Sequence, residues 1–212
     1  MSPFFVAVDP VIKYSSMKLS EYINWLESEE FDYYSDTMKF ADHTQPGHTF
    51  VRNVTVPTLD FIKKITTLPR SNGKNLENVY TYGRHPVLDS WADKTFPEFR
   101  YKQTLVQLQK PGDKVAPHVD TLHGQIKEWM EKDPTLGDIE HSMQNPNPNF
   151  KARRYFIGVE DHVEGQSFKI NNDAWEWKKG DTISLNVWRA VHNTVNNSNK
   201  DRYIIKVTGL EK

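Results

Sequence analysis

The stretch Lys179-Gly-Asp-Thr-Ile-Ser-Leu-Asn-Val187 combines a turn signal with a strand signal. Its first three residues carry the glycine and aspartate of a turn, and the remainder is a short run rich in β-forming residues. Other short β-rich runs separated by turn residues follow through the second half of the chain, so we expect strands at residues 101–109, 115–120, 154–160, 167–170, 174–177, 182–187, 192–195 and 202–208. Many short, evenly spaced strands predict a mainly β protein with a closed jelly-roll core.

The domain organisation follows from length and local pattern. A chain of 212 residues with 37% hydrophobic residues suits one domain, residues 1–212. We expect residues 1–100 to be a mixed helical and strand support, with helices at 20–31, capped by Ser20, and at 58–68. Residues 101–210 form the core, interrupted by an insertion at 121–149. The insertion is either a lid or substrate wall, or a surface excursion without a role.

Composition excludes several classes of function. The formal net charge of -1 gives no basic footprint for a nucleic acid, and no apolar run reaches the length of about 20 residues that spans a bilayer. The N-terminus carries no positively charged leader. The absence of cysteine rules out disulfides and thiolate metal sites, and it fits an intracellular, cytoplasmic protein.

Two histidines and one aspartate form the candidate metal site. His118-Val-Asp120 places an imidazole and a carboxylate two residues apart, and such residues share one face of a strand. Such a triplet alone more often has only a structural role, but His192 on a later strand supplies a third ligand. Two imidazoles and one carboxylate are the facial triad of non-haem Fe(II) oxygenases, although zinc accepts the same ligands. The other histidines are expected to be non-ligands, mostly at the surface: His43, His48, His85, His123, His141 and His162.

Arg202 supports the interpretation of these three residues as the metal site of an oxygenase. It lies ten positions after His192, across a turn and at the start of the next expected strand. A planar guanidinium suits bidentate capture of a carboxylate. The alternative is an edge-strand arginine in solvent, but the apolar flanks Tyr203, Ile204 and Ile205 favour a buried strand.

These motifs together resemble the 2-oxoglutarate- and Fe(II)-dependent oxygenases. Within them the sequence is most similar to the aspartyl/asparaginyl β-hydroxylase-like branch, which includes small bacteriophage hydroxylases. The likeness covers about half the chain, and besides the triad and Arg202 it rests on Arg154-Tyr-Phe-Ile-Gly-Val159, Gly165-Gln-Ser-Phe168 and Gly180-Asp181. The family has a double-stranded β-helix core, cupin-like, with flanking helices. The phage members leave a viral origin open.

The resemblance implies a role for each matching residue. His118, Asp120 and His192 would bind iron, and Arg202 would bind the distal carboxylate of 2-oxoglutarate. Arg154 would assist with that carboxylate, whereas its neighbour Arg153 would point the other way. Gln107, on the strand before the triad, is a further candidate for a hydrogen bond to the co-substrate.

Departures from the family narrow the expected chemistry. The namesake aspartyl hydroxylase lacks the metal carboxylate that Asp120 supplies here, so its substrate is not carried over. Nucleic-acid demethylases carry a second arginine where this chain has Thr208, and related halogenases replace the carboxylate with a small residue. The expected enzyme is therefore a dioxygenase that uses Fe(II), 2-oxoglutarate and O₂ to hydroxylate a protein or peptide side chain or a small molecule. The alternatives are a metal-dependent cupin-like enzyme without a ketoacid and a non-enzymatic jelly-roll binding module.

Overall fold

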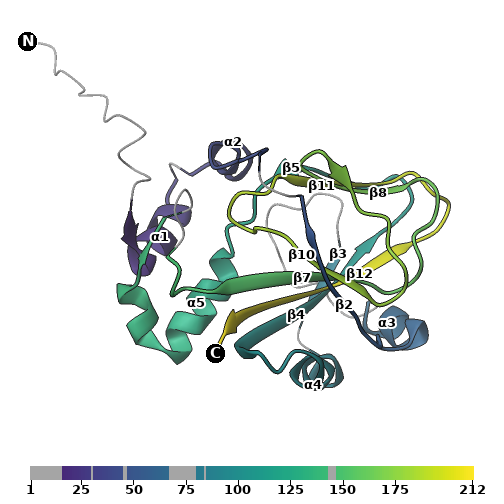
Figure 1. Ribbon diagram of the computed structural model, residues 1–212, viewed down its shortest axis with the longest axis horizontal. Coiled ribbons are helices and arrows are strands. Elements are labelled where there is room, and N and C mark those ends of the chain that lie inside the picture. The colour runs from purple at the N-terminus through teal and green to yellow at the C-terminus, as the bar shows by residue number, and fades with distance from the viewer. Residues whose placement is uncertain (1–15, 30, 45–46, 67–79, 84, 143–146) are drawn as a thin grey trace, which may run out of the picture. The chain divides into compact units, whose positions relative to one another are not determined.

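The computed structural model describes residues 16–29, 31–44, 47–66, 80–83, 85–142 and 147–212 (Figure 1). The chain divides into two compact units. The first, called the helical unit here, comprises Met1–Phe31 and Leu122–Phe150. The second, called the barrel unit, comprises Asp32–Thr121 and Lys151–Lys212. The expectation of a single domain stays a prediction.

The helical unit joins the start of the chain to the insertion. Its elements are β1 (Met17–Lys18), α1 (Leu19–Leu26), α5 (His123–Lys132), a 3-10 helix (Pro134–Asp138) and β6 (Glu140–His141). β1 pairs with β6, and the buried side of α1 contacts α5 and the 3-10 helix. His141 is only 1% exposed, between the rings of Tyr22 and Phe150, so its expected surface position is wrong. Packing from distant segments buries it, which its polar neighbours in sequence did not indicate.

The barrel unit contains two antiparallel sheets. The six-stranded sheet has the order β2 (Thr49–Asn53), β10 (Asp181–Ser184), β7 (Ala152–Gly158), β12 (Arg202–Glu211), β4 (Phe99–Gln109) and β3 (Tyr80–Gly83). The four-stranded sheet has the order β5 (Lys114–His118), β11 (His192–Asn196), β8 (Gln166–Ile170) and β9 (Asp173–Ala174). The chain passes from one of these sheets to the other at β4–β5, between β5 and β7, and at β7–β8, β9–β10, β10–β11 and β11–β12. This alternation is the double-stranded β-helix, so the expected fold class is confirmed.

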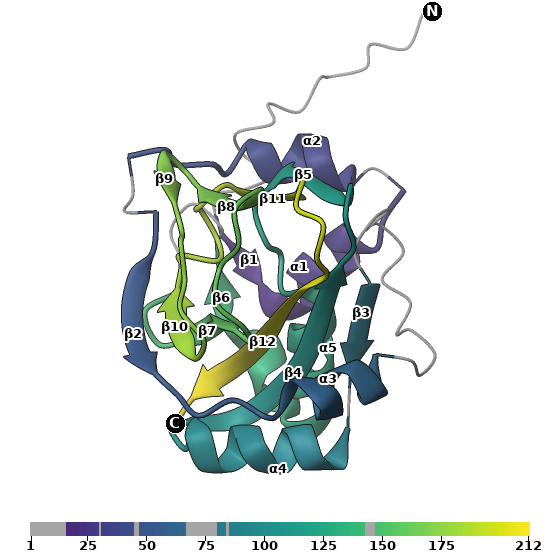
Figure 2. The same ribbon diagram turned by 90° about the vertical axis from the view of Figure 1, so that its right-hand side faces the viewer.

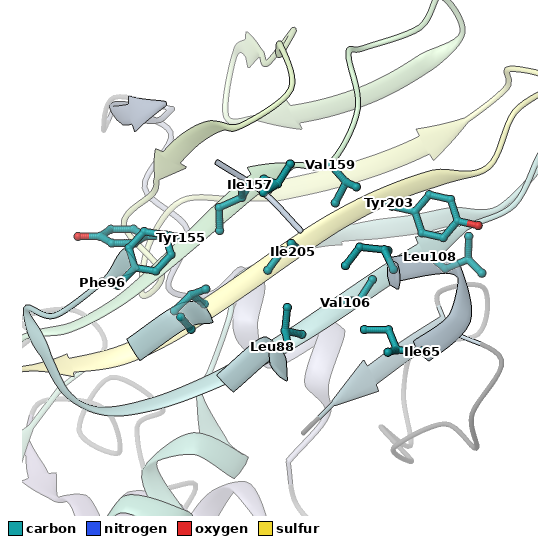
Figure 3. Packing of buried hydrophobic residues seen from close by; sticks show 14 of the residues in the cluster. Ile65, Leu88, Phe96, Val106, Leu108, Tyr155, Ile157, Val159, Tyr203 and Ile205 are labelled. Atoms are coloured by element: carbon teal, nitrogen blue, oxygen red, sulfur yellow. The ribbon is translucent and has the colours of Figure 1, made fainter. Parts of the chain in front are cut away.

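The hydrophobic core lies on the outer face of the six-stranded sheet. Figures 1 and 2 show α3 (Leu59–Ile65) and α4 (Pro86–Thr95) on the side of this sheet that faces away from the four-stranded sheet. Alternate residues of the central strands pack there together with Val207, and Figure 3 labels seven of them: Val106, Leu108, Tyr155, Ile157, Val159, Tyr203 and Ile205. Each large apolar side chain buried in this way contributes roughly 1.5–3 kcal/mol.

The opposite, inner face of the same strands is polar for a buried surface. Because side chains alternate along a strand, the residues that lie between the core residues in the sequence point into the space between the two sheets. On β12 these are Arg202, Ile204, Lys206 and Thr208, all 8% exposed or less. The interior of the barrel is therefore lined by charged groups, and a buried charge requires a partner or a ligand.

Several expected boundaries differ from the structure. α1 begins at Leu19, where Lys18 and not Ser20 is the cap, with the Lys18 amide donating to Glu21. β5 ends at His118, so Asp120 lies just beyond the strand. The strand expected at 174–177 is reduced to the short β9, and beyond it the rings of Trp175 and Trp177 pack in a tilted arrangement with centroids 4.9 Å apart. α2 (Tyr33–Met38), which was not expected, packs against β5.

In the described part of the chain, no helix is long and apolar enough to cross a membrane.

Candidate metal centre

Three predicted ligands converge inside the barrel unit. His118 is the last residue of β5, His192 is the first residue of β11, and the two are direct cross-strand partners. Asp120 follows β5 by two residues. One ligand atom from each of the three side chains lies within 4.8 Å of the others, and all three residues are buried. The distances from Asp120 are 3.9 Å to His118 Nε2 and 3.7 Å to His192 Nε2.

Backbone carbonyls orient both imidazoles. His118 Nδ1 lies 2.8 Å from the carbonyl oxygen of Ala116, and His192 Nδ1 lies 3.2 Å from that of Ala190. A carbonyl oxygen only accepts, so each Nδ1 carries the proton and donates it. Each Nε2 then presents a lone pair toward Asp120. Metal-binding histidines are commonly fixed in this way by a hydrogen bond from the other ring nitrogen.

The donor set fits a divalent cation. Asp120 Oδ2 is buried and forms an ion pair with Arg154 at 2.6 Å. A carboxylate has about four lone pairs on its two oxygens, so Asp120 can bind a metal ion and keep this ion pair. One carboxylate oxygen and one ring nitrogen from each histidine would then hold the ion. Imidazole and carboxylate donors suit iron, zinc and manganese.

The electrostatics keep the three groups ready for a metal. Burial, and next the neighbouring His118, lower the pKa of His192 to about 3, and burial also lowers the pKa of His118. Both rings are therefore neutral at pH 7. Burial acts to raise the pKa of Asp120, but Arg154 and then His192 outweigh it and hold that pKa far below its usual value. The site presents two neutral imidazoles and one carboxylate, the protonation states that a metal needs.

Arg154 contacts the metal-site aspartate. Its Nη1 lies 2.6 Å from Asp120 Oδ2, and its Nε donates a 2.8 Å hydrogen bond to Thr208 Oγ1 on β12. Arg153 points the other way, as strand alternation predicts, and pairs with Glu211 at 2.9 Å. The structure thus places Arg154 beside a metal ligand, and its assistance to the co-substrate stays a prediction.

Arg202 is buried on the inner face and not in solvent. It is 4% exposed, its Nη1 donates to the Ser167 carbonyl at 3.0 Å, and its Cζ lies 5.9 Å from the ring centroids of Phe168 and Trp177. Among the described residues, no carboxylate pairs with it. Burial lowers the pKa of Arg202 to about 9. Together with Gln166, Trp177 and Tyr203 it also lines a cavity of about 490 Å³.

Gln107 and Lys206 complete the inner face near the site. Gln107 is half-buried and is the cross-strand partner of Ile204, which lies midway between Arg202 and Lys206 along β12. Lys206 is a site residue that the sequence analysis missed. It is 8% exposed, with Nζ 5.5 Å from the ring centroid of Phe156. A usable signal was present, because positions 202 and 206 of one strand must share a face.

Comparisons with known proteins add likenesses at low identity. No protein-family model matches the sequence, and no curated protein matches it significantly. A prolyl-4-hydroxylase from Pseudomonas putida has a similar structure, with a TM-score of 0.41, 8% identity and coverage of 66% of this chain and 77% of that one. A predicted oxalate decarboxylase from Thermotoga maritima has a TM-score of 0.33 and 14% identity, with coverage of 62% of this chain and 80% of that one. A protein with a double-stranded β-helix domain from Klebsiella pneumoniae has a TM-score of 0.36 and 12% identity, with coverage of 71% of this chain and 94% of that one.

The fold and the site define a class. The barrel unit is a cupin-type double-stranded β-helix, as its strand order shows. Its interior holds a buried His–Asp–His group that can bind a metal ion.

Proposed function

We propose that the protein is an Fe(II)- and 2-oxoglutarate-dependent dioxygenase that hydroxylates an unactivated C–H bond. The observation that carries the proposal is the convergence of two neutral imidazoles and one carboxylate within 4.8 Å, in a barrel whose inner face also carries buried cations. Two histidines and one carboxylate leave coordination positions open for a ketoacid and O₂.

Buried charge supports a dianionic co-substrate. Arg154, Arg202 and Lys206 are three cations on the inner face of the six-stranded sheet, and Asp120 pairs with the first of them. Arg202 and Lys206 have no carboxylate partner among the described residues. Burying two uncompensated cations is expensive, and a ligand with two carboxylates would offset that cost. A cupin-like enzyme without a ketoacid, or a binding module without a metal, would need another anionic ligand to balance this excess of buried positive charge.

The residues of this chain have separate tasks in the proposed reaction. Iron(II) held here would supply the coupling of O₂ reduction to decarboxylation of 2-oxoglutarate, which gives succinate and CO₂, and to hydroxylation of the substrate. His118, Asp120 and His192 hold the ion. Arg202 grips the distal carboxylate and so sets the angle of the co-substrate.

Other residues orient the ligands and exclude water. Arg154 fixes the Asp120 carboxylate by their ion pair. Phe156 and Phe168, whose ring centroids lie 5.9 and 6.0 Å from that of His192, keep water from one side of the site. A dry site strengthens each of these polar contacts.

The prime substrate is proposed only as a class. A protein or peptide side chain is favoured by the resemblance of the motifs, with a small molecule as the alternative. We also propose an intracellular setting for the enzyme, which its cysteine-free composition supports.

Release of labelled CO₂ tests the proposal. Iron-loaded protein is incubated aerobically with 2-oxoglutarate carrying ¹³C at carbon 1 and with ascorbate, which supplies the two electrons that the prime substrate would otherwise give. ¹³CO₂ is measured together with succinate. Even without its prime substrate the wild type should release both slowly, and Asp120→Ala should release neither. Arg202→Met should raise the KM for 2-oxoglutarate, whereas Arg153→Met, on the exposed outer face, should match the wild type. Folded, iron-loaded wild-type protein that yields no ¹³CO₂ would contradict the proposal.

A further inference from the structure

Lys206 is a buried cation that the proposed chemistry does not yet use. It is 8% exposed, and in the described part of the chain it makes no hydrogen bond or ion pair. Its nearest recorded contact is the face of Phe156. A lysine in such a position loses hydration without a hydrogen bond or ion pair to replace it, so its burial indicates a ligand that arrives later.

The position of Lys206 is close to the metal ligands. On β12 it pairs across the ladder with Phe156 of β7, and the ring of Phe156 contacts His192 at a centroid distance of 5.9 Å. Lys206 also influences the pKa of all three proposed ligands, Asp120, His118 and His192.

Arg202 occupies the other end of the same strand face. It lies four positions earlier than Lys206, which places the two Cα atoms about 13 Å apart along an extended strand. Its contacts are Ser167 and Phe168 on β8, together with Trp177, and burial alone perturbs its pKa. The two cations therefore face different ends of any ligand that lies along the barrel.

We propose that Lys206 binds the carboxylate that a 2-oxo acid places beside the metal, while Arg202 binds the carboxylate at the far end. This assignment rests on the proposed function and gives it a two-ended recognition of the ketoacid. Arg154 is not free for the first task, because it already engages Asp120 and Thr208. Lys206 is thus a positioning residue for the end of the ligand that reacts, and it would contact every 2-oxo acid, with or without a distal carboxylate.

Two ketoacids separate the two ends. 2-Oxopentanoate has a methyl group where 2-oxoglutarate has its distal carboxylate, and is otherwise the same length. Binding of each to Mn(II)-loaded protein is measured by isothermal titration calorimetry, which needs no turnover. The variants are Lys206→Met and Arg202→Met, with Lys206→Arg as the charge-conserving change. Lys169→Met, an exposed lysine on β8, is the matched control.

The expected pattern differs between the variants. Lys206→Met should weaken both ketoacids by a similar factor, about 10- to 100-fold for one lost charge-assisted contact. Arg202→Met should weaken 2-oxoglutarate by a comparable factor and leave 2-oxopentanoate within about twofold. Lys206→Arg should recover part of the affinity for both, and Lys169→Met should match the wild type. Circular dichroism and the Mn(II) stoichiometry confirm that each variant is folded and loaded.

The outcomes distinguish two failures. If Lys206→Met weakens only 2-oxoglutarate, or neither ketoacid, the assignment of Lys206 to the metal-side carboxylate is wrong while the proposed function stands. If the metal-loaded wild type binds neither ketoacid, the proposed function itself fails and this assignment fails with it.

Discussion

Replacing Arg154 with methionine tests how the buried charges of the site are balanced. The side chains of Arg154 and Asp120 are each 6% exposed and form an ion pair at 2.6 Å. Removing one partner of a buried pair leaves the other uncompensated, at a typical cost of about 3–5 kcal/mol. We expect Arg154→Met to lower the free energy of unfolding of the metal-free protein by that amount. A divalent ion on Asp120 would replace the lost positive charge, so with Zn(II) bound the loss should shrink to less than about half.

Urea denaturation measures both states. Wild-type protein and variants are unfolded in the presence of EDTA or of saturating Zn(II), and the two free energies are compared. Arg153→Met is the matched control: its side chain is 52% exposed and pairs with Glu211 at the surface, so it should cost less than about 1 kcal/mol in either state. The reasoning would be refuted if Arg154→Met lost the same free energy of unfolding with and without Zn(II). It would also be refuted if Arg153→Met lost as much as Arg154→Met.

Three further predictions concern pH and packing. Burial lowers the pKa of Lys206 to about 7, so the unfolded chain binds more protons between pH 7 and 10.5 and the metal-free protein gains stability as pH rises through that window. Lys206→Met should remove this slope and, by pH-dependent denaturation, stabilise the metal-free protein by up to about 4 kcal/mol at pH 7. Because the pKa of His192 is lowered to about 3 and that of His118 is also lowered, Zn(II) affinity should stay nearly flat from pH 8 to 6.5, and a steep loss beginning at pH 6.5 would contradict it. Gly158→Ala would place a Cβ 2.3 Å from Trp177 Cδ1 and should cost about 1–3 kcal/mol in thermal or urea unfolding, whereas Gly124→Ala, with no atom within 4 Å, should cost nothing.

Local pattern predicted most of the strands and the three residues of the candidate metal site. The apolar flanks of Arg202 predicted a buried strand, and β12 is buried along most of its length. His118 and His192 were placed on strands correctly. Asp120 reaches the site for a different reason from the one expected, because β5 ends at His118 and the aspartate lies beyond the strand.

Contacts between distant segments were beyond the sequence analysis. Residues 1–31 join residues 122–150 in one compact unit, and no local pattern connects the two segments. The burial of His141 follows from that unit, and burial lowers its pKa to about 4. The ion pair of Arg154 with Asp120 joins β7 to the segment after β5, and no local pattern in the sequence indicated it.

Anaerobic absorption spectroscopy tests the central claim most directly. Metal-free protein receives one equivalent of Fe(II) and is then titrated with 2-oxoglutarate in the absence of O₂. We predict a visible metal-to-ligand charge-transfer band that saturates at one ketoacid per chain and is absent when His192→Ala protein is treated identically. Folded wild-type protein that binds no iron, or that binds iron and develops no band, would contradict the account.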